Sequence, residues 1–434
     1  MLVLLLAAVA LQAGFFALLR LRDFQRYAVE FIAVILAMSL FYIVSAWRVS
    51  KNDTLPRRPA LTLMVLAGLA FRLTLAPLDP TLTEDPYRYR WNAKLQAAGG
   101  NPYRERPGDA RWEGLRDRTW PLVTGKDLTS PYGPLLEWTY RLTFAVASRL
   151  TADEFRQVWL FKLPYAAADL GAAALLVRLG GARALIYLWS PLVVVEFWAS
   201  GHNDSMLLFF LLLALQLASG GRWIWAFGAL WAATLIKFWP ALLFPLFLLA
   251  AGRQGLWALA WIPTALLVAA PYWGAVSEVQ WILQGFLGGW TNNASLFHLI
   301  YAAAGRDFEQ TRSIMTALVG AATLGIAWRR RPLPDAMLRT ITVLLLLSAN
   351  AFPWYLTWLL PFLVLRPSPA LLLWTALAPL AYHVLIGYHA LSRWAEDPFF
   401  LYLEYLPVYG MLLAAPWLSG RSPPEASASR SAAS

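Results

Sequence analysis

The sequence contains no cysteine, which excludes disulfide bonds, thiolate metal sites and cysteine nucleophiles. Charged residues make up only 14% of its 434 residues, whereas soluble proteins carry roughly 25%. It also has no glycine-rich phosphate loop followed by a helix, and no short-period repeat. Apolar sequence is abundant instead: 59% of the residues are hydrophobic and the mean hydropathy is +0.51. These values predict a polytopic membrane protein.

The net charge of +11 has two possible origins. In a soluble protein it would indicate nucleic-acid binding. Here Arg and Lys cluster in short loops between apolar blocks, where they set the topology and meet anionic lipid head groups. We therefore expect a lipid bilayer as the partner, and no nucleic acid.

Apolar blocks of about 13 to 20 residues recur along the chain, near the roughly 20 that a helix needs to span a bilayer. The first block lacks a basic region before it and is long enough to span, so it is interpreted as a transmembrane helix and not as a cleaved signal peptide. We expect an all-α polytopic membrane protein with about 13 to 14 transmembrane helices. Residues 1–418 are expected to form a single transmembrane domain, and the Ser-, Pro- and Ala-rich residues 419–434 a disordered cytoplasmic tail. The expected spans are 2–19, 29–47, 60–78, 157–178, 184–199, 205–219, 223–236, 239–251, 255–273, 312–328, 336–349, 353–366, 370–388 and 399–418.

A long polar insert, residues 79–156, interrupts these blocks. Within it, residues 134–150 place Glu137 and Arg141 four positions apart and favour one apolar face, as expected of a helix that lies flat at the interface. If this helix lies flat, most Arg-bearing short loops, including Arg329–Arg331, fall on one side, which the positive-inside rule makes cytoplasmic. The insert is then external, and both termini are cytoplasmic.

Polar residues gather at the outer ends of the helices in this topology. That asymmetry predicts a site on the external side of the membrane. The residues concerned are Glu84, Asp85, Glu196, His202, Asp204, Lys237, Asn292, Asn293, His298, Asn350, His383 and His389.

Within the insert, Glu84 and Asp85 are candidates for a general base, because a carboxylate near lipid has a raised pKa. The alternative is a helix cap, since Thr83 to Asp85 before Pro86 is a typical helix start. Arg88 is suited to phosphate recognition but equally to a solvated helix face.

Three further ionisable residues have open interpretations. His202 could bind an anion or a metal, or be a hydrogen-bonded structural residue. Lys237, between two apolar blocks, is either functional or snorkels to the outer head groups. Asp169 lies in the middle of a span, where we expect a partner on a neighbouring helix.

The stretch DPYRYRWNAKLQAAGGNPYRERP resembles the first external loop of polyprenol-phosphate-dependent mannosyltransferases of the glycosyltransferase C superfamily. It is most similar to the bacterial branch that includes glycosyltransferase family 87 and the lipoglycan mannosyltransferases. The resemblance covers roughly residues 60–415. Its motifs here are Glu84-Asp85, Tyr87-Arg88-Tyr89, Trp91, Gly100-Asn101-Pro102-Tyr103, Tyr132-Gly133-Pro134, GHND at 201–204, KFWP at 237–240, TNNASLF at 291–297 and PWYLTWLLP at 353–361.

The resemblance implies a glycosyltransferase C fold whose insert carries the catalytic acid. Asp85, with Glu84 beside it, would be the base of an inverting transfer from a polyprenyl-phosphate sugar to a glycolipid or glycan acceptor. No metal and no cofactor is expected. The enzyme would lie in the bacterial cytoplasmic membrane with its active site outside. Arg88, Lys237 and His202 would bind the donor phosphate, and the substrate-binding residues would be Tyr87, Tyr89, Trp91, Tyr132, Asp204, Asn292, Asn293, His298, Trp354, Tyr355 and His383.

Two other classes compete with this interpretation. A transporter or flippase of lipid-linked saccharides would show polar residues near mid-membrane and broken helices in both halves. An O-antigen-ligase-like enzyme would depend on Arg and His without an acid in the first loop.

Overall fold

The computed structural model describes residues 1–51, 57–275, 291–391 and 394–414. Within these residues every secondary-structure element is a helix, apart from one isolated β-bridge between Asn292 and Asn350. The disordered tail expected at 419–434 lies outside the described residues. The N-terminal half of the bundle consists of α1 (Leu2–Leu21), α2 (Ala28–Lys51), α3 (Arg57–Leu75), α7 (Leu163–Gly180), η3 (Gly181–Ala184), α8 (Leu185–Leu188), α9 (Pro191–Val194), η4 (Val195–Ala199), α10 (Asp204–Ser219) and α11 (Trp223–Ile236). Between α3 and α7 the insert carries α4 (Asp85–Ala97), η1 (Ala110–Leu115), η2 (Trp120–Leu122), α5 (Pro134–Leu150) and α6 (Glu154–Leu160).

The C-terminal half continues the all-helical pattern. Its elements are η5 (Trp239–Leu243), α12 (Phe244–Ala251), η6 (Gly252–Trp261), α13 (Ile262–Ala269), η7 (Ala270–Ala275), α15 (Leu296–Ala303), α16 (Phe308–Trp328), α17 (Leu333–Leu347), α18 (Pro353–Leu356), α19 (Leu360–Leu365), α20 (Pro369–Leu377), η8 (Ala378–His383), α21 (Val384–Leu391) and α22 (Pro398–Ala414).

Six of the described helical segments are long and apolar enough to cross a membrane, and a seventh arises if α9–η4 and α10, which meet at a bend of 119°, form one span. The predicted all-α polytopic membrane protein is therefore confirmed. The number of such segments is lower than the 13 to 14 expected, because several apolar blocks form shorter helices. In the block 353–366, for example, the helix stops at Leu356 and a new one begins at Leu360.

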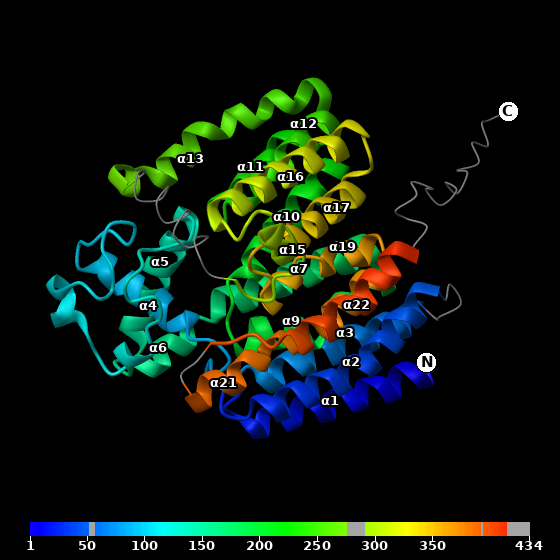
Figure 1. Ribbon diagram of the computed structural model, residues 1–434, viewed down its shortest axis with the longest axis horizontal. Coiled ribbons are helices and arrows are strands. Elements are labelled where there is room, and N and C mark those ends of the chain that lie inside the picture. Colours follow the sequence, from blue (N-terminus) through cyan, green and yellow to red (C-terminus); the bar gives the residue numbers. More distant parts are fainter. Residues whose placement is uncertain (52–56, 276–290, 392–393, 415–434) are drawn as a thin grey trace.

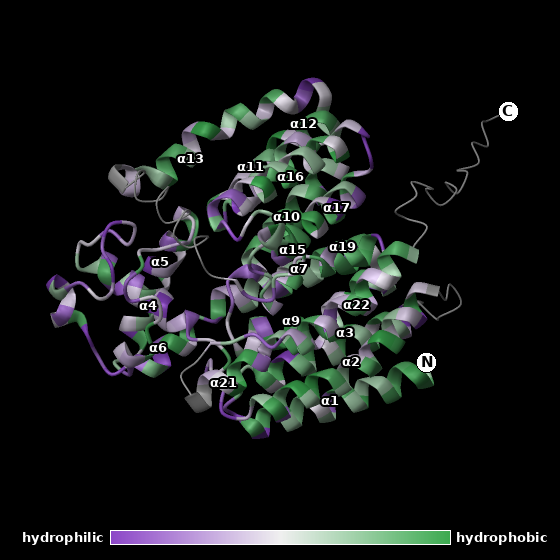
Figure 2. Ribbon diagram, in the orientation of Figure 1, coloured by the Kyte–Doolittle hydropathy of each residue, from purple (hydrophilic) through white to green (hydrophobic). Residues whose placement is uncertain are grey.

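The insert forms a unit of its own at one end of the bundle. In Figure 1, α4, α5 and α6 project from the end opposite Met1, and Figure 2 shows polar residues concentrated there and where the insert meets the bundle. The insert has a separate hydrophobic core, made of Tyr87, Trp91, Leu95, Trp112, Val123 and Val158. Its helix α5 has the bounds expected for the interfacial helix, and it is not one of the candidate spans.

Gly133 fixes the insert to the bundle. Its N–H donates to the carbonyl of Ile236 at 3.0 Å, and a Cβ at this position would lie 2.1 Å from the carbonyl oxygen of Leu235. A larger residue would push the chain away from the end of α11. The Tyr132-Gly133-Pro134 element is thus held against the point where α11 stops before Lys237.

A buried ion pair and its hydrogen bonds join four helices of the N-terminal half, α3, α7, α8 and η4. The Arg72 guanidinium on α3 lies 2.6 Å from Asp169 on α7, and the two side chains are 1% and 0% exposed. Tyr187 and Trp198 also donate to Asp169, at 2.7 and 2.8 Å. The expected neighbouring-helix partner of Asp169 is therefore Arg72, and the pair anchors the π-helix η4 through Trp198.

Candidate active site

Asp85 lies at the start of α4, where the insert faces the bundle. Its backbone N–H donates to the Thr83 hydroxyl at 3.2 Å, and Pro86 follows in the first turn, so the predicted helix start is confirmed. The Tyr89 and Tyr132 hydroxyls both donate to Asp85 Oδ2, at 3.2 and 3.4 Å. Within the described residues nothing hydrogen-bonds to Oδ1, and the Asp85 side chain is 30% exposed. One oxygen of Asp85 is thus anchored while the other is open.

Glu84 has a different environment from Asp85. It occupies the N-cap position of α4, but its side chain accepts no capping hydrogen bond there. Burial raises the pKa of Glu84, and the neighbouring Asp85 raises it further, whereas Lys126 lowers it. The capping role considered for this acid pair is filled by Thr83, which accepts the N–H of Asp85.

His202 reaches Asp85 from the bend between η4 and α10. Its Nε2 lies 3.9 Å from Asp85 Oδ2, and its Nδ1 lies 2.9 Å from Glu196 Oε2. The imidazole is 1% exposed and stacks on the Trp354 ring, with the ring centroids 4.5 Å apart. Gly201 has φ +75, and a Cβ there would lie 2.8 Å from Lys162 Cγ, so the bend that presents His202 requires glycine.

Lys237 lies in the break that follows α11. Its Nζ donates to Asp204 Oδ1 at 2.6 Å and lies 5.2 Å from the centre of the Tyr355 ring. The Trp358 indole also donates to Asp204 Oδ1, at 2.6 Å. The Lys237 side chain is 17% exposed, whereas Asp204 is 1% exposed. Lys237 is therefore held at the edge of the site by a buried carboxylate, and one donated hydrogen bond leaves two of its N–H groups for other partners.

Arg88 is buried in the insert, where its guanidinium is already engaged. Its nitrogens donate to Asn92 and to the backbone carbonyls of Thr124, Gly125 and Leu128, at 2.6 to 3.0 Å. These bonds hold the loop that comes after η2 against α4. We assign Arg88 to this loop clamp in place of the donor-phosphate contact predicted from the sequence, because four of its five N–H groups are used.

The aromatic residues of the first-loop motif separate into two sets. Tyr89 and Tyr132 lie beside Asp85, and Tyr89 stacks on Tyr140 with ring centroids 4.7 Å apart. Tyr87 and Trp91 instead belong to the insert core and are 6% and 3% exposed. Both rings pack inside the insert, and their substrate contacts stay predictions.

The segment after residue 291 forms a second polar group with α22. Asn293 donates through Nδ2 to both oxygens of the buried Glu404, at 3.1 and 3.2 Å, and its backbone N–H donates to Glu396. Asn292 pairs through its backbone with the strand-like residues at 349–351. His298 Nε2 lies 3.8 Å from Glu396. In the described part of the chain, none of these side chains has a hydrogen bond or ion pair with Asp85.

His383 also makes structural contacts through both of its ring nitrogens. Its Nδ1 lies 2.8 Å from the Leu380 carbonyl, its Nε2 accepts the N–H of Asp397 at 2.8 Å, and its ring stacks on Phe400. Both ring nitrogens are therefore engaged by backbone groups. Asn292, Asn293, His298 and His383, predicted to bind substrate, lie in this second group and not around Asp85.

Tyr382 and Trp358 were not among the predicted residues of the site, and Glu196 was predicted only as one of the polar residues at the outer helix ends, with no role. Glu196 contacts His202, the Tyr382 hydroxyl donates to Glu196 at 2.5 Å, and Trp358 holds Asp204. The sequence contained a signal for Glu196, because it is a single carboxylate inside an apolar block, where ionisable residues are expensive and usually functional. Tyr382 and Trp358 could not be distinguished from other aromatic residues of the spans.

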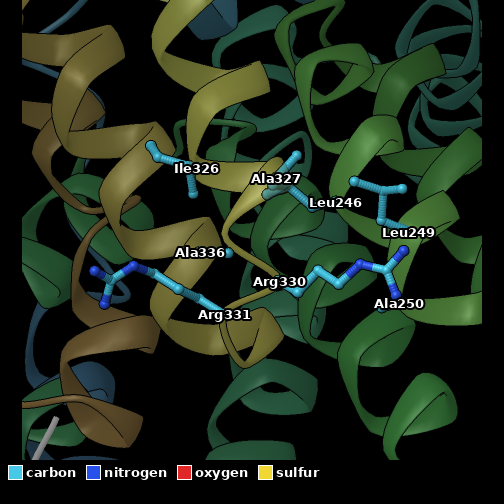
Figure 3. Close-up of a pocket in the computed structure, with 8 residues that line it drawn as sticks. All are labelled: Leu246, Leu249, Ala250, Ile326, Ala327, Arg330, Arg331 and Ala336. Atoms are coloured by element: carbon cyan, nitrogen blue, oxygen red, sulfur yellow. The ribbon is translucent and has the colours of Figure 1, made fainter. Parts of the chain in front are cut away.

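Among the described residues, no three His, Asp or Glu side chains are grouped so that they could hold a metal ion. The expectation of a metal-independent reaction stays a prediction. A small cavity of about 70 Å³ lies between α12, α16 and the start of α17 (Figure 3). It is lined by Arg330, Arg331 and apolar side chains, and these elements contribute none of the residues around Asp85.

Fold and site together are those of a polytopic membrane protein whose polar insert carries a carboxylate that accepts from two tyrosines and lies near a histidine. Residues 3–253, more than half of the chain, match the family model described as alpha-(1->6)-mannopyranosyltransferase, N-terminal domain. The chain belongs to this family and is a membrane glycosyltransferase. No curated protein and no solved structure matches the chain.

Proposed function

We propose that the protein is an inverting mannosyltransferase that uses a polyprenyl-phosphate sugar donor and has a glycosyltransferase C fold. The acceptor is a hydroxyl of a glycolipid or glycan. The observation that carries the proposal is the asymmetry of Asp85: Oδ2 is anchored by two tyrosines, while Oδ1 is open on a partly exposed side chain. A general base needs one free lone pair within hydrogen-bond reach of the attacking hydroxyl.

In this reaction, Asp85 Oδ1 takes the proton as the acceptor oxygen attacks the anomeric carbon. The bond from that carbon to the phosphate oxygen breaks on the opposite face, and polyprenyl phosphate leaves. Inversion converts a β-linked donor into an α-linked product, in agreement with the family's name. The negative charge that develops on the phosphate requires a nearby cation.

Lys237 is the cation that best fits the leaving phosphate. It is partly exposed, lies at the edge of the site, and keeps two N–H groups after donating to Asp204. Of the other two cations predicted for this role, Arg88 is used in the loop clamp, and His202 lies between Glu196 and Asp85. The phosphate contact is therefore proposed for Lys237 alone.

The proposed orientation places the insert outside the bacterial cytoplasmic membrane and both termini inside. In Figure 1 the insert projects from the end opposite Met1, and the turn after α16, which holds Arg329–Arg331, lies at the Met1 end. Positive residues on the side opposite the insert agree with the positive-inside rule.

The test uses purified protein in lipid nanodiscs with radiolabelled polyprenyl-phosphate mannose and a mixed acceptor extract. Transfer of the label to acceptor, with stoichiometric release of polyprenyl phosphate and an α configuration by NMR, is the expected result. If no label is transferred but reconstituted vesicles move the labelled lipid between leaflets, the protein is a transporter and the proposal is wrong.

A further inference from the structure

A line of ionisable groups extends inward from the proposed base. His202 Nε2 lies 3.9 Å from Asp85 Oδ2, and His202 Nδ1 lies 2.9 Å from Glu196 Oε2. The Tyr382 hydroxyl then donates to Glu196 Oε1 at 2.5 Å. Exposure falls from 30% at Asp85 to 1% at His202 and 0% at Glu196. A carboxylate, an imidazole and a second carboxylate thus follow one another from the site into the protein.

The backbone is specifically shaped to bring these groups together. Glu196 lies in the π-helix η4. The π-helix is rare in proteins overall, but where it occurs it is frequently part of a functional site. The bend after η4 passes through Gly201 at φ +75, and the N–H of His202 donates to the carbonyl of Glu196 at 2.9 Å. The bend therefore folds His202 back over Glu196 and toward the insert.

The surrounding charges favour a protonated imidazole. A fully buried carboxylate such as Glu196 is costly unless a cation compensates it, and His202 is in direct contact with it. Asp85 and Asp204 are the other charged groups that act on His202, and both are acidic. The aliphatic part of the Lys162 side chain lies beside Gly201, but its ammonium donates to the carbonyls of Ala76 and Leu78 and not to the groups around His202.

We propose that His202 is the positioning residue of the base, a permanent imidazolium that Glu196 holds in place and that keeps Asp85 ionised. This inference rests on the proposed function and assigns a role to His202 within the same site. The imidazolium and the two tyrosines turn Oδ2 inward, so Oδ1 faces the acceptor. The acceptor proton moves to Oδ1 and leaves to water after the product departs, while His202 keeps its own proton throughout.

The test is the pH profile of kcat/KM for mannosyl transfer. An opposite charge within about 4 to 6 Å lowers a carboxyl pKa by about one to three units, so His202→Asn should move the acid limb upward by about that amount. Activity of the variant should then recover in part at high pH. Glu196→Gln keeps the shape but removes the charge, and it should move the basic limb downward, because the imidazolium loses its proton more easily.

His383→Asn is the matched control, since His383 is also buried but both of its nitrogens meet backbone groups. It should leave both limbs of the profile in place, even where less protein folds. If His202→Asn lowers kcat/KM by the same factor at every pH, as a structural defect would, the inference is overturned. A wild-type enzyme without transferase activity would instead overturn the proposed function.

A second measurement detects the protonation state of His202 directly and needs no transferase activity. The chain has four histidines, so NMR of 15N-histidine-labelled protein gives few imidazole signals, and the one lost in His202→Asn is assigned to His202. This signal should remain that of an imidazolium above pH 8 in wild type and titrate at lower pH in Glu196→Gln. A neutral imidazole signal at pH 7 in the wild type would contradict the proposal.

Discussion

The buried pair of Arg72 and Asp169 offers the sharpest prediction about stability. Asp169 accepts from Arg72 Nε at 2.6 Å and Nη2 at 3.3 Å, from Tyr187 at 2.7 Å and from Trp198 at 2.8 Å. Both charged side chains are at most 1% exposed. Asp169→Asn keeps the shape but leaves the Arg72 cation without its counter-ion, a change that costs about 3–5 kcal/mol in buried pairs. Proteins are typically stable by only about 5–15 kcal/mol, so this loss is large.

The assay is unfolding by SDS titration in mixed micelles, followed by far-UV circular dichroism. Trp198→Phe, which removes one hydrogen bond to the charged Asp169, should cost less, about 1.5–3 kcal/mol. The double variant Arg72→Met with Asp169→Leu removes both charges and should recover most of the stability lost in Asp169→Asn. An Asp169→Asn protein within about 1 kcal/mol of wild type, or a double variant no better than the single one, would show that Arg72 does not need Asp169 as its counter-ion.

Three further predictions concern the insert, the donor and the topology. Burial raises the pKa of Glu137 to about 7 from 4.5, so the folded protein binds more protons between these values. Stability should therefore fall by up to about 3 kcal/mol as pH rises through this window, and thermal unfolding of Glu137→Gln should lose that slope. Lys237→Ala should raise the KM for the donor about tenfold or more and leave that for the acceptor nearly unchanged; equal effects on both would show that Lys237 only fills space beside Asp204. A cysteine at position 331 should react with a membrane-impermeant maleimide only from the cytoplasmic side, and labelling from outside would reverse the proposed orientation.

Local signals made much of the insert predictable. Thr83, Asp85 and Pro86 form a helix start that depends only on neighbouring residues, and α4 begins at Asp85. Pro134 begins α5, and the amphipathic spacing of its residues is continuous to Leu150. The all-α class followed in the same way, because uninterrupted apolar blocks in lipid must satisfy their own backbone hydrogen bonds.

The roles of charged residues could not be read in this way, because their partners are distant in the sequence. From the sequence, Arg88 is a candidate phosphate ligand. In the fold, its guanidinium donates to backbone carbonyls that lie 36 to 40 residues later in the chain. The approach of Asp85, Glu196 and His202 depends on how the insert packs on the bend after η4. A motif shows that such residues are present, but only the fold shows which of them meet.

We propose Asp85, and not its neighbour Glu84, as the catalytic base. Only Asp85 has one oxygen held by Tyr89 and Tyr132 and the other open. Loss of a general base costs about 10²–10⁴-fold in rate. The most direct measurement compares kcat for mannosyl transfer by Asp85→Asn and Glu84→Gln, with donor binding measured in parallel. We expect Asp85→Asn to bind donor normally but to lose at least about 10²-fold in kcat, whereas Glu84→Gln should stay within about threefold of wild type. Near-normal transfer by a folded Asp85→Asn protein would contradict this assignment.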